Sequence, residues 1–212
     1  MITLVVGEMG SGKTLYALNF IRAAVTSRRP VFTNIALKPD CPFADKVALI
    51  GDEQFPIAAR QRNAAGHQYF WNYISAPRSV VVLDEANIYF DTSMHREMER
   101  EAIEAMQYIR KAGMDLVLLC HTIDNLWVRV RRMAARFIVC DHNWRSSRMV
   151  RMMGKDWSRF WYAEFADKRF CADTVRGVGH FSWREASKMF GWYDTRQIMC
   201  DTARFAMFKG KA

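Results

Sequence analysis

One octapeptide near the start of the chain constrains the fold more than any other stretch of the sequence. Residues 7–14 fit the phosphate-binding template G-x-x-x-x-G-K-[ST] at every fixed position. The apolar run at residues 2–6 predicts a buried strand before it, and apolar residues at helical spacing from Thr14 to Thr26 predict a helix after it. The predicted phosphate-binding residues are Gly7, Glu8, Met9, Gly10, Ser11, Gly12, Lys13 and Thr14.

This loop predicts a site for a nucleoside triphosphate, with ATP and Mg²⁺ as the expected ligands. Glycines let backbone N–H groups wrap closely around an anion at a helix N-terminus. Lys13 would add a positive charge at the β- and γ-phosphates, and the Thr14 hydroxyl would bind the metal. The alternative, a glycine-rich turn arising by chance, does not account for the flanking strand and helix.

Length and composition are those of a globular protein with an anionic partner. The chain has 212 residues, half of them apolar, and a formal charge of +9. We expect one domain over 1–212, with a core at about 1–150, an insert at 39–78 and a basic, aromatic elaboration at about 145–212. Nucleic acid is the first expected partner and a membrane surface the second, against the alternative of a merely soluble basic protein.

The cysteines and the apolar runs predict a soluble protein of a reducing cytoplasm. Five scattered cysteines form no C-x-x-C pair, so they indicate neither a zinc site nor a disulfide framework. Met1 leads directly into the first strand without a secretory signal, and no apolar run approaches the ~20 residues that span a bilayer. We therefore expect no transmembrane segment in the chain itself.

The remaining periodicity predicts an α/β fold. Strands are expected near 30–35, 79–83, 116–120 and 137–140, and helices at 97–111 and 125–133. The insert is expected to hold at most short helices. Residues 145–170 suggest antiparallel strands, and short helical pieces are expected from Gly177 onward. The predicted architecture is a three-layer domain with a mostly parallel central sheet and an antiparallel edge.

A hydrophobic run that ends in Asp84-Glu85 supplies the second half of a triphosphatase site. Asp84, at the carboxyl end of its strand, would hold Mg²⁺ directly or through water. Glu85 is placed to polarise the water that attacks the γ-phosphate. The alternative is that one or both acids cap the next segment.

Two further residues are candidates for catalysis. His121 follows the next predicted strand, where it could sense the γ-phosphate, although a lone histidine in this place is more often structural. Arg110 closes a predicted helix and could complete the site of a neighbouring subunit. A basic residue at a helix C-terminus is at least as good an explanation of Arg110.

A basic stripe between residues 129 and 151 is the candidate nucleic-acid surface. It holds seven arginines and a single acid, Asp141, with aromatic residues among them. Arginine forks suit phosphate oxygens and aromatic rings stack on bases, whereas the alternative is a solvated basic face. The arginines are Arg129, Arg131, Arg132, Arg136, Arg145, Arg148 and Arg151.

Over about residues 1–150 the chain resembles the HerA–FtsK superfamily of P-loop motor ATPases, whose domain is RecA-like. The resemblance rests on residues 7–14, on Leu83-Asp84-Glu85-Ala86 and on two further segments. Residues 31–35 are similar to the V-x-T-N-I of zonula occludens toxin-like assembly proteins of filamentous phages. Residues 110–115 are similar to an R-(H/K)-x-G-x-D segment shared with genome-packaging ATPases of membrane-containing icosahedral viruses. Residues 193–195, Tyr-Asp-Thr, resemble a third element of such phage ATPases.

The resemblance implies a homo-oligomeric ring, a hexamer or pentamer, that hydrolyses ATP. Filamentous-phage assembly proteins continue into a membrane-spanning helix and an outer domain that this chain lacks, which favours a DNA-packaging motor that fills a preformed capsid. An assembly or extrusion ATPase at the inner membrane is the first alternative, and a nucleotide-gated binding module with little turnover is the second. Capsid or membrane-vertex proteins are implied partners, in the host cytoplasm or at the packaging vertex. His121 departs from the family's usual Gln or Asn.

Overall fold

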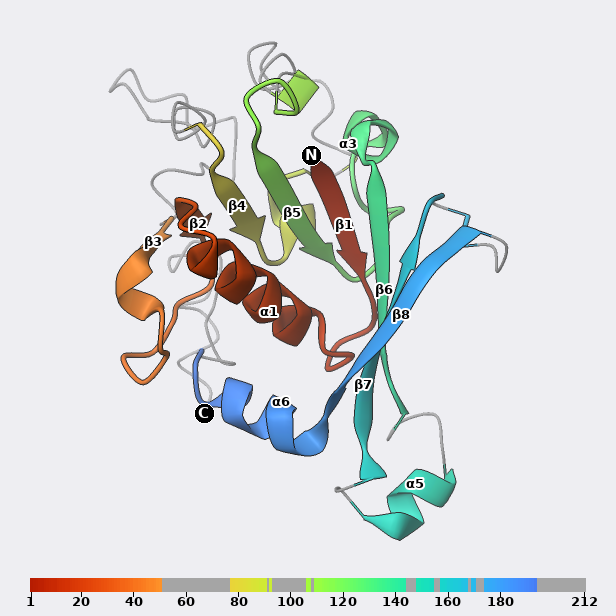
Figure 1. Ribbon diagram of the computed structural model, residues 1–212. Coiled ribbons are helices and arrows are strands. Elements are labelled where there is room, and N and C mark those ends of the chain that lie inside the picture. The colour runs from red at the N-terminus through yellow and green to blue at the C-terminus, as the bar shows by residue number, and fades with distance from the viewer. Residues whose placement is uncertain are drawn as a thin grey trace, which may run out of the picture.

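The computed structural model has a single eight-stranded sheet at its centre (Figure 1). It describes residues 1–50, 77–90, 92, 106–107, 109–143, 148–154, 157–167, 169–170 and 174–193. The strand order is β3-β2-β4-β5-β1-β6-β7-β8. The strands from β3 to β6 are mutually parallel, and β7 and β8 continue the sheet antiparallel. The predicted mixed α/β sheet is therefore confirmed.

The parallel strands are short and largely apolar, as expected for strands covered on both faces. Their bounds are β1 Ile2–Val6, β2 Val31–Thr33, β3 Val47–Leu49, β4 Val80–Leu83, β5 Asp115–Cys120 and β6 Arg136–His142. Leu4 pairs with Leu118 of β5 on one side and with Phe137 of β6 on the other. The strand that leads into the phosphate loop thus lies in the interior of the sheet.

Alternate residues of each strand face two separate hydrophobic layers. One layer packs the Val5 side of the sheet against α1 (Lys13–Thr26) and α6 (Trp183–Phe190). The other packs the Leu4 side against the 3₁₀ helix η3 (Ala86–Ile88) and α3 (Val128–Met133). Helices on both faces of a sheet make the three layers that were predicted.

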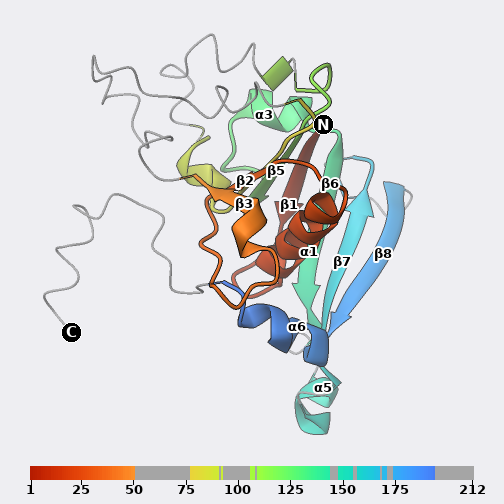
Figure 2. The same ribbon diagram turned by 60° about the vertical axis from the view of Figure 1, so that its left-hand side comes forward.

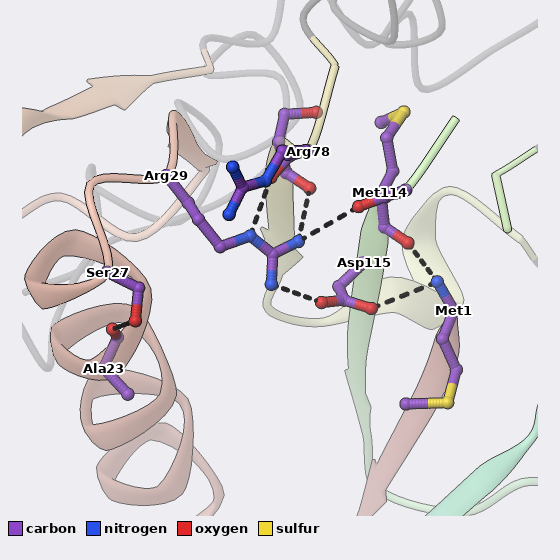
Figure 3. Close-up of polar contacts among 9 residues, drawn as sticks. Met1, Ala23, Ser27, Arg29, Arg78, Met114 and Asp115 are labelled. Atoms are coloured by element: carbon purple, nitrogen blue, oxygen red, sulfur yellow. Dashed lines mark hydrogen bonds and ion pairs between the residues drawn. The ribbon is translucent and has the colours of Figure 1, made fainter. Parts of the chain in front are cut away.

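Arg29 ties the end of α1 to the edge of the sheet where the parallel strands begin (Figure 3). Its Nη1 lies 2.6 Å from Asp115 Oδ2, and its Nε donates to the Arg78 carbonyl at 2.7 Å. Nη2 donates to the carbonyl of Ser79. One half-buried guanidinium therefore fixes the helix against β4 and β5, whose first residues are Val80 and Asp115.

The last two strands form a long hairpin at one edge of the sheet. β7 (Arg159–Phe165) pairs with β6, and β8 (Val175–Ser182) pairs with β7 and forms the edge. Figure 2 shows the short helix α5 (Arg148–Met153) beyond the end of this hairpin. Ser182 then caps α6 reciprocally with Glu185, because the Ser182 side chain accepts from Glu185 N–H and the Glu185 side chain from Ser182 N–H.

Four local predictions differ from the structure. Antiparallel strands were expected over about 145–170, but residues 148–153 form the helix α5 before β7 begins. The insert was expected to hold at most short helices, but it contributes β3 as well as the 3₁₀ helix η1 (Ala44–Lys46). The structure extends the antiparallel edge to Ser182, where helical pieces were expected from Gly177. The helix predicted over 125–133 begins only at Val128. Most of the helix predicted over 97–111 lies outside the described residues.

Among the described residues, no helix combines the length and the apolar character needed to cross a bilayer.

Candidate nucleotide-binding site

The loop between β1 and α1 has a backbone that depends on its glycines. Gly10 and Gly12 have φ values of 72° and 96°, in the left-handed region that other residues rarely adopt. A Cβ on Gly7 would lie 2.4 Å from the Cys140 carbonyl oxygen and 2.5 Å from Ser11 Oγ. The loop is therefore closed tightly against β6.

Lys13 lies across this loop. Its Nζ donates to the carbonyls of Gly7 at 2.8 Å and Glu8 at 3.0 Å, and it lies 3.3 Å from His121 Nδ1. Burial lowers the pKa of the Lys13 ammonium, while the charges of Asp84 and Glu85 act in the opposite direction. The lysine is thus a cation enclosed by acceptors at the point where a phosphate would enter.

The side chains of Thr14 and Asp84, the two predicted metal ligands, form a hydrogen bond with each other. Thr14 Oγ1 donates to Asp84 Oδ2 at 3.2 Å, although the residues are 70 positions apart. Burial raises the pKa of the Asp84 carboxyl, and its hydrogen bond with Glu85 N–H opposes that effect. The two oxygens converge where the carboxyl end of β4 faces the start of α1.

Asn34, to which sequence reasoning gave no role, holds the backbone of Asp84. Its Oδ1 accepts from Asp84 N–H at 2.8 Å, and its Nδ2 donates to the Asp84 carbonyl at 3.0 Å. The same Nδ2 lies 3.2 Å from the Tyr89 hydroxyl. Asn34 follows β2, which pairs directly with β4, so the amide meets the end of the acidic strand. The V-x-T-N-I similarity marked this residue without showing its role.

His121 connects the two catalytic candidates. Its Nδ1 faces Lys13 Nζ, and its Nε2 lies 3.1 Å from Glu85 Oε1. Because an ammonium only donates, Nδ1 accepts and Nε2 carries the proton that is donated to Glu85. His121 can stand between them because β5, which it follows, lies between β4 and β1. Glu85 itself has φ 50°, in the left-handed region that residues other than glycine rarely adopt.

The residues present fit a nucleoside triphosphate with a divalent cation. The Gly7 position leaves no space for a side chain, and Ser11 Oγ is buried without a hydrogen-bond partner in the part of the chain that the structure describes. A hydroxyl and a carboxylate are oxygen donors of the kind that Mg²⁺ prefers, and phosphate oxygens supply the rest of its shell. The loop backbone, Lys13 and the two oxygen donors are therefore suited to phosphates and to a hard metal ion.

Arg110 lies far from this loop. It is exposed in the turn before β5, at the edge of the sheet where the parallel strands begin, whereas the phosphate loop follows the end of β1. Its carbonyl accepts from Gly113 N–H at 3.2 Å. In its own chain Arg110 is thus separated from the phosphate loop by the length of the sheet, and its role in a neighbouring subunit stays a prediction.

The six arginines of the basic stripe that the structure describes do not share one surface. Arg131 lies 3.0 Å from Asp124 Oδ1, and Arg136 forms a bidentate pair with Glu164 across β6 and β7. The exposed arginines on α3 and on α5 lie at opposite ends of β6 (Figure 1). These four are Arg129, Arg132, Arg148 and Arg151. Arg145 lies outside the described residues.

A family model described as Zonular occludens toxin (Zot) matches residues 1–197, which is nearly the whole chain. The chain belongs to the zonular occludens toxin family. The resemblance found in the sequence is therefore confirmed for this group.

The chain is similar to three known proteins. It is 30% identical over 161 residues to the putative assembly protein ORF301 of Pseudomonas phage Pf3, covering 74% of this chain and 47% of that protein. The N-terminal domain of zonular occludens toxin from Neisseria meningitidis matches with a TM-score of 0.59 and 20% identity, over 91% of this chain and 98% of that one. B204, the DNA-packaging ATPase from Sulfolobus turreted icosahedral virus, matches with a TM-score of 0.54 and 15% identity, over 85% and 96%.

These likenesses differ in what they support. The two solved structures share less than a quarter of their residues with this chain, so they show a common fold. This family member spans about half the length of ORF301, at 47%. The activity and the partners of such a protein as a whole are therefore proposals for this chain.

Proposed function

We propose that this protein hydrolyses ATP with Mg²⁺ at the loop of residues 7–14 and that the energy serves phage assembly. The observation that carries the first half is the 3.2 Å contact of Thr14 Oγ1 with Asp84 Oδ2, because it joins the two expected metal ligands beside the lysine of the loop. Mg²⁺, when bound by these residues, would neutralise phosphate charge. Loop N–H groups and Lys13 would bind the phosphates.

The residues around the metal position divide the remaining chemistry. Glu85, whose carboxylate can accept a proton, is the general base for the attacking water. His121 donates through Nε2 to Oε1 of the Glu85 carboxylate and so orients it. Binding of a γ-phosphate at Lys13 would replace the contacts that the ammonium makes with the loop carbonyls and with His121. The histidine is thus placed to respond to the nucleotide.

The assembly role rests on the relatives. The family match covers residues 1–197, and the curated relative at 30% identity is named a putative assembly protein. The likeness to a DNA-packaging ATPase is one of fold, at 15% identity. We therefore place assembly or extrusion ahead of capsid packaging, reversing the order that the sequence alone favoured.

A homo-oligomeric ring and DNA are the partners that we propose for this machine. Arg110, remote from its own loop, would reach the site of a neighbour. Arg129 and Arg132 on α3 are the exposed pair that we propose for phosphate contact, and Arg148 and Arg151 on α5 form a second pair. Arg131 and Arg136 already have carboxylate partners, which makes them poorer candidates.

Steady-state ATP hydrolysis with and without DNA, at low and at moderate salt, tests this proposal. Mg²⁺-dependent hydrolysis that a Lys13→Ala variant lacks would support the site, and equal turnover by that variant would overturn it. Stimulation by DNA that fades as salt rises would support a nucleic-acid motor. Turnover that is indifferent to DNA at every salt concentration would favour a motor that acts on protein partners.

A further inference from the structure

A cavity lies at the opposite end of α1 from the phosphate loop. It has a volume of about 640 Å³ and is formed by the last turns of α1, the segment around η1 and Trp192. Such a volume is within the range of small-molecule sites, roughly 300–1,000 Å³. The helix has 14 residues, so the two sites are on the order of 20 Å apart. The cavity is therefore separate from the proposed triphosphatase site.

Three exposed cations line this cavity, and no carboxylate in the described part of the chain pairs with them. Arg22, Arg28 and Lys46 form no ion pair with any carboxylate among the described residues, and Arg22 donates to the neutral Asn19 Oδ1 at 2.6 Å. Asp45, next to Lys46, is an exposed acid of the same segment. Among the described residues, the cavity thus carries a surplus of positive charge that no ion pair neutralises.

Arg29 lines the same cavity, but its guanidinium already binds other groups of the protein. Its guanidinium is occupied by Asp115 and by the carbonyls of Arg78 and Ser79 (Figure 3). The turn that follows places Arg28 at a φ of 54°, and Arg28 N–H closes onto the Val25 carbonyl at 2.9 Å. The neighbouring Arg28 side chain is therefore presented from a turn whose position Arg29 holds.

The helix dipole of α1 does not account for all the residues that line this cavity. Basic residues at the end of a helix offset its dipole, which would account for the arginines at the end of α1. Lys46, however, comes from η1, and the floor includes two aromatic rings from separate segments. Phe43 is buried and Trp192 is half-buried, with ring centroids 5.7 Å apart at 80°. A cationic rim over an aromatic floor suits a ligand that has both a phosphate and a planar ring.

We propose that this cavity binds a nucleotide unit, with its phosphate on Arg22, Arg28 and Lys46 and its base against Trp192. The unit could belong to a single-stranded nucleic acid or be a free mononucleotide, since both present the same chemistry. This cavity is distinct from the proposed ATP site, because none of its residues belongs to the phosphate loop or to the carboxyl ends of β4 and β5.

The test measures fluorescence anisotropy of a labelled oligothymidylate and of a fluorescent AMP with the full chain. Lys13→Ala serves as the background, so that the phosphate loop does not bind the probes. The pocket variant is Arg28→Glu with Lys46→Glu. Its charge-matched control is Arg184→Glu with Lys188→Glu, two exposed residues of α6 that do not line the cavity. Trp192→Leu keeps the charge and removes the ring.

The proposal expects the pocket variant to bind the oligonucleotide about tenfold or more weakly, since phosphate contacts contribute strongly to affinity. The control should stay within about threefold of the parent, and Trp192→Leu should weaken binding without changing the salt slope. If the variants weaken AMP binding to the same extent, the ligand is a free nucleotide. If they weaken only oligonucleotide binding, the ligand is a single-stranded nucleic acid. Equal losses in pocket and control variants, or no binding of either probe, would overturn the proposal.

ATP hydrolysis, measured on the same substitutions in the otherwise unchanged protein, keeps this test separate from the proposed function. Turnover without DNA should be unchanged in the pocket and control variants, and melting temperatures should agree with the parent protein. A failure of hydrolysis in the parent would overturn the proposed function and leave the binding result to decide the cavity.

Discussion

At the scale of single residues, the site depends on side chains that orient others. Asn34 is the clearest case, because its amide makes two hydrogen bonds to the backbone of Asp84 and so holds the end of the acidic strand in place. We expect Asn34→Ala to lower the rate of hydrolysis about 10- to 100-fold, because Asp84 is the proposed metal ligand and loss of a residue that supports a metal ligand commonly has this effect. Nucleotide affinity measured without Mg²⁺ should change little, and a large loss of that affinity would contradict the positioning role.

His121 offers a second prediction at this scale. In the structure it accepts from Lys13 and donates to Glu85, and the amide of a glutamine can do both. We expect His121→Gln to retain most of the turnover and His121→Ala to lose roughly 10- to 100-fold or more. Steady-state kinetics of both variants decide this, and an alanine variant as active as the parent would remove His121 from the mechanism.

The buried thiols give a prediction that can be tested without measuring ATP hydrolysis. Burial raises the pKa of both Cys120 and Cys140 to about 12, so at pH 8 very little thiolate is present. We expect a thiol reagent at pH 8 to leave both residues unmodified in the folded protein and to label both in denaturant. Mass spectrometry of the digested protein reads each cysteine separately, and rapid labelling of either in the folded state would contradict this packing.

At the scale of elements, the pair between β6 and β7 holds the antiparallel edge to the parallel sheet. Arg136 donates through two nitrogens to Glu164, and both side chains are only about a quarter exposed. Replacing Glu164 with Gln should lower the free energy of unfolding by about 1–3 kcal/mol at neutral pH. A double-mutant cycle with Arg136→Met should show coupling, measured by denaturant unfolding.

The same pair predicts how this contribution depends on pH. The hydrogen bond from Arg136 lowers the pKa of Glu164 below the ordinary value of 4.5. The stabilisation is therefore complete above that ordinary value and is lost as the pH falls through the lowered pKa of the folded state. The difference in unfolding free energy between the parent and Glu164→Gln should shrink over this acid range, and a constant difference would contradict the assignment.

Sequence reasoning found the elements whose signal is local and missed those that depend on pairing. Residues 2–6 and the phosphate loop carry their pattern within a dozen positions, so the strand, the loop and the helix α1 were predictable. β3 is three residues long with two of them exposed, and it forms because β2 offers it a parallel partner. β8 contains two glycines and no strong alternation, and its strand state comes from pairing with β7.

The same distinction holds for the site. Lys13, Thr14, Asp84 and Glu85 were named from motifs, and the role of Asn34 was not, because it requires β2 to lie beside β4. The seven arginines are close in sequence, yet β6 passes between the two exposed pairs and separates them in space (Figure 1). The exposed arginines of this segment are therefore close in sequence without forming one continuous basic surface.

At the scale of the whole molecule, the order of the sheet explains the arrangement of the proposed ATPase. β5 stands between the strand of the phosphate loop and the strand of Asp84 and Glu85, and His121 at its end spans the gap between them. Opposite this edge lie Arg110, α3 and the end of α1. The fold thus places the proposed chemistry at one edge and the proposed intersubunit arginine at the other.

The most direct test of the central claim compares ATP binding with ATP hydrolysis in Glu85→Gln. Glutamine keeps the shape of the side chain and cannot take a proton from water, so we predict nucleotide affinity within about threefold of the parent and a rate of hydrolysis lower by about 10²–10⁴-fold. Both are read in one single-turnover experiment with Mg²⁺ and radiolabelled ATP. Hydrolysis at the parental rate by this variant would contradict the assignment of Glu85 and, with it, the proposed mechanism.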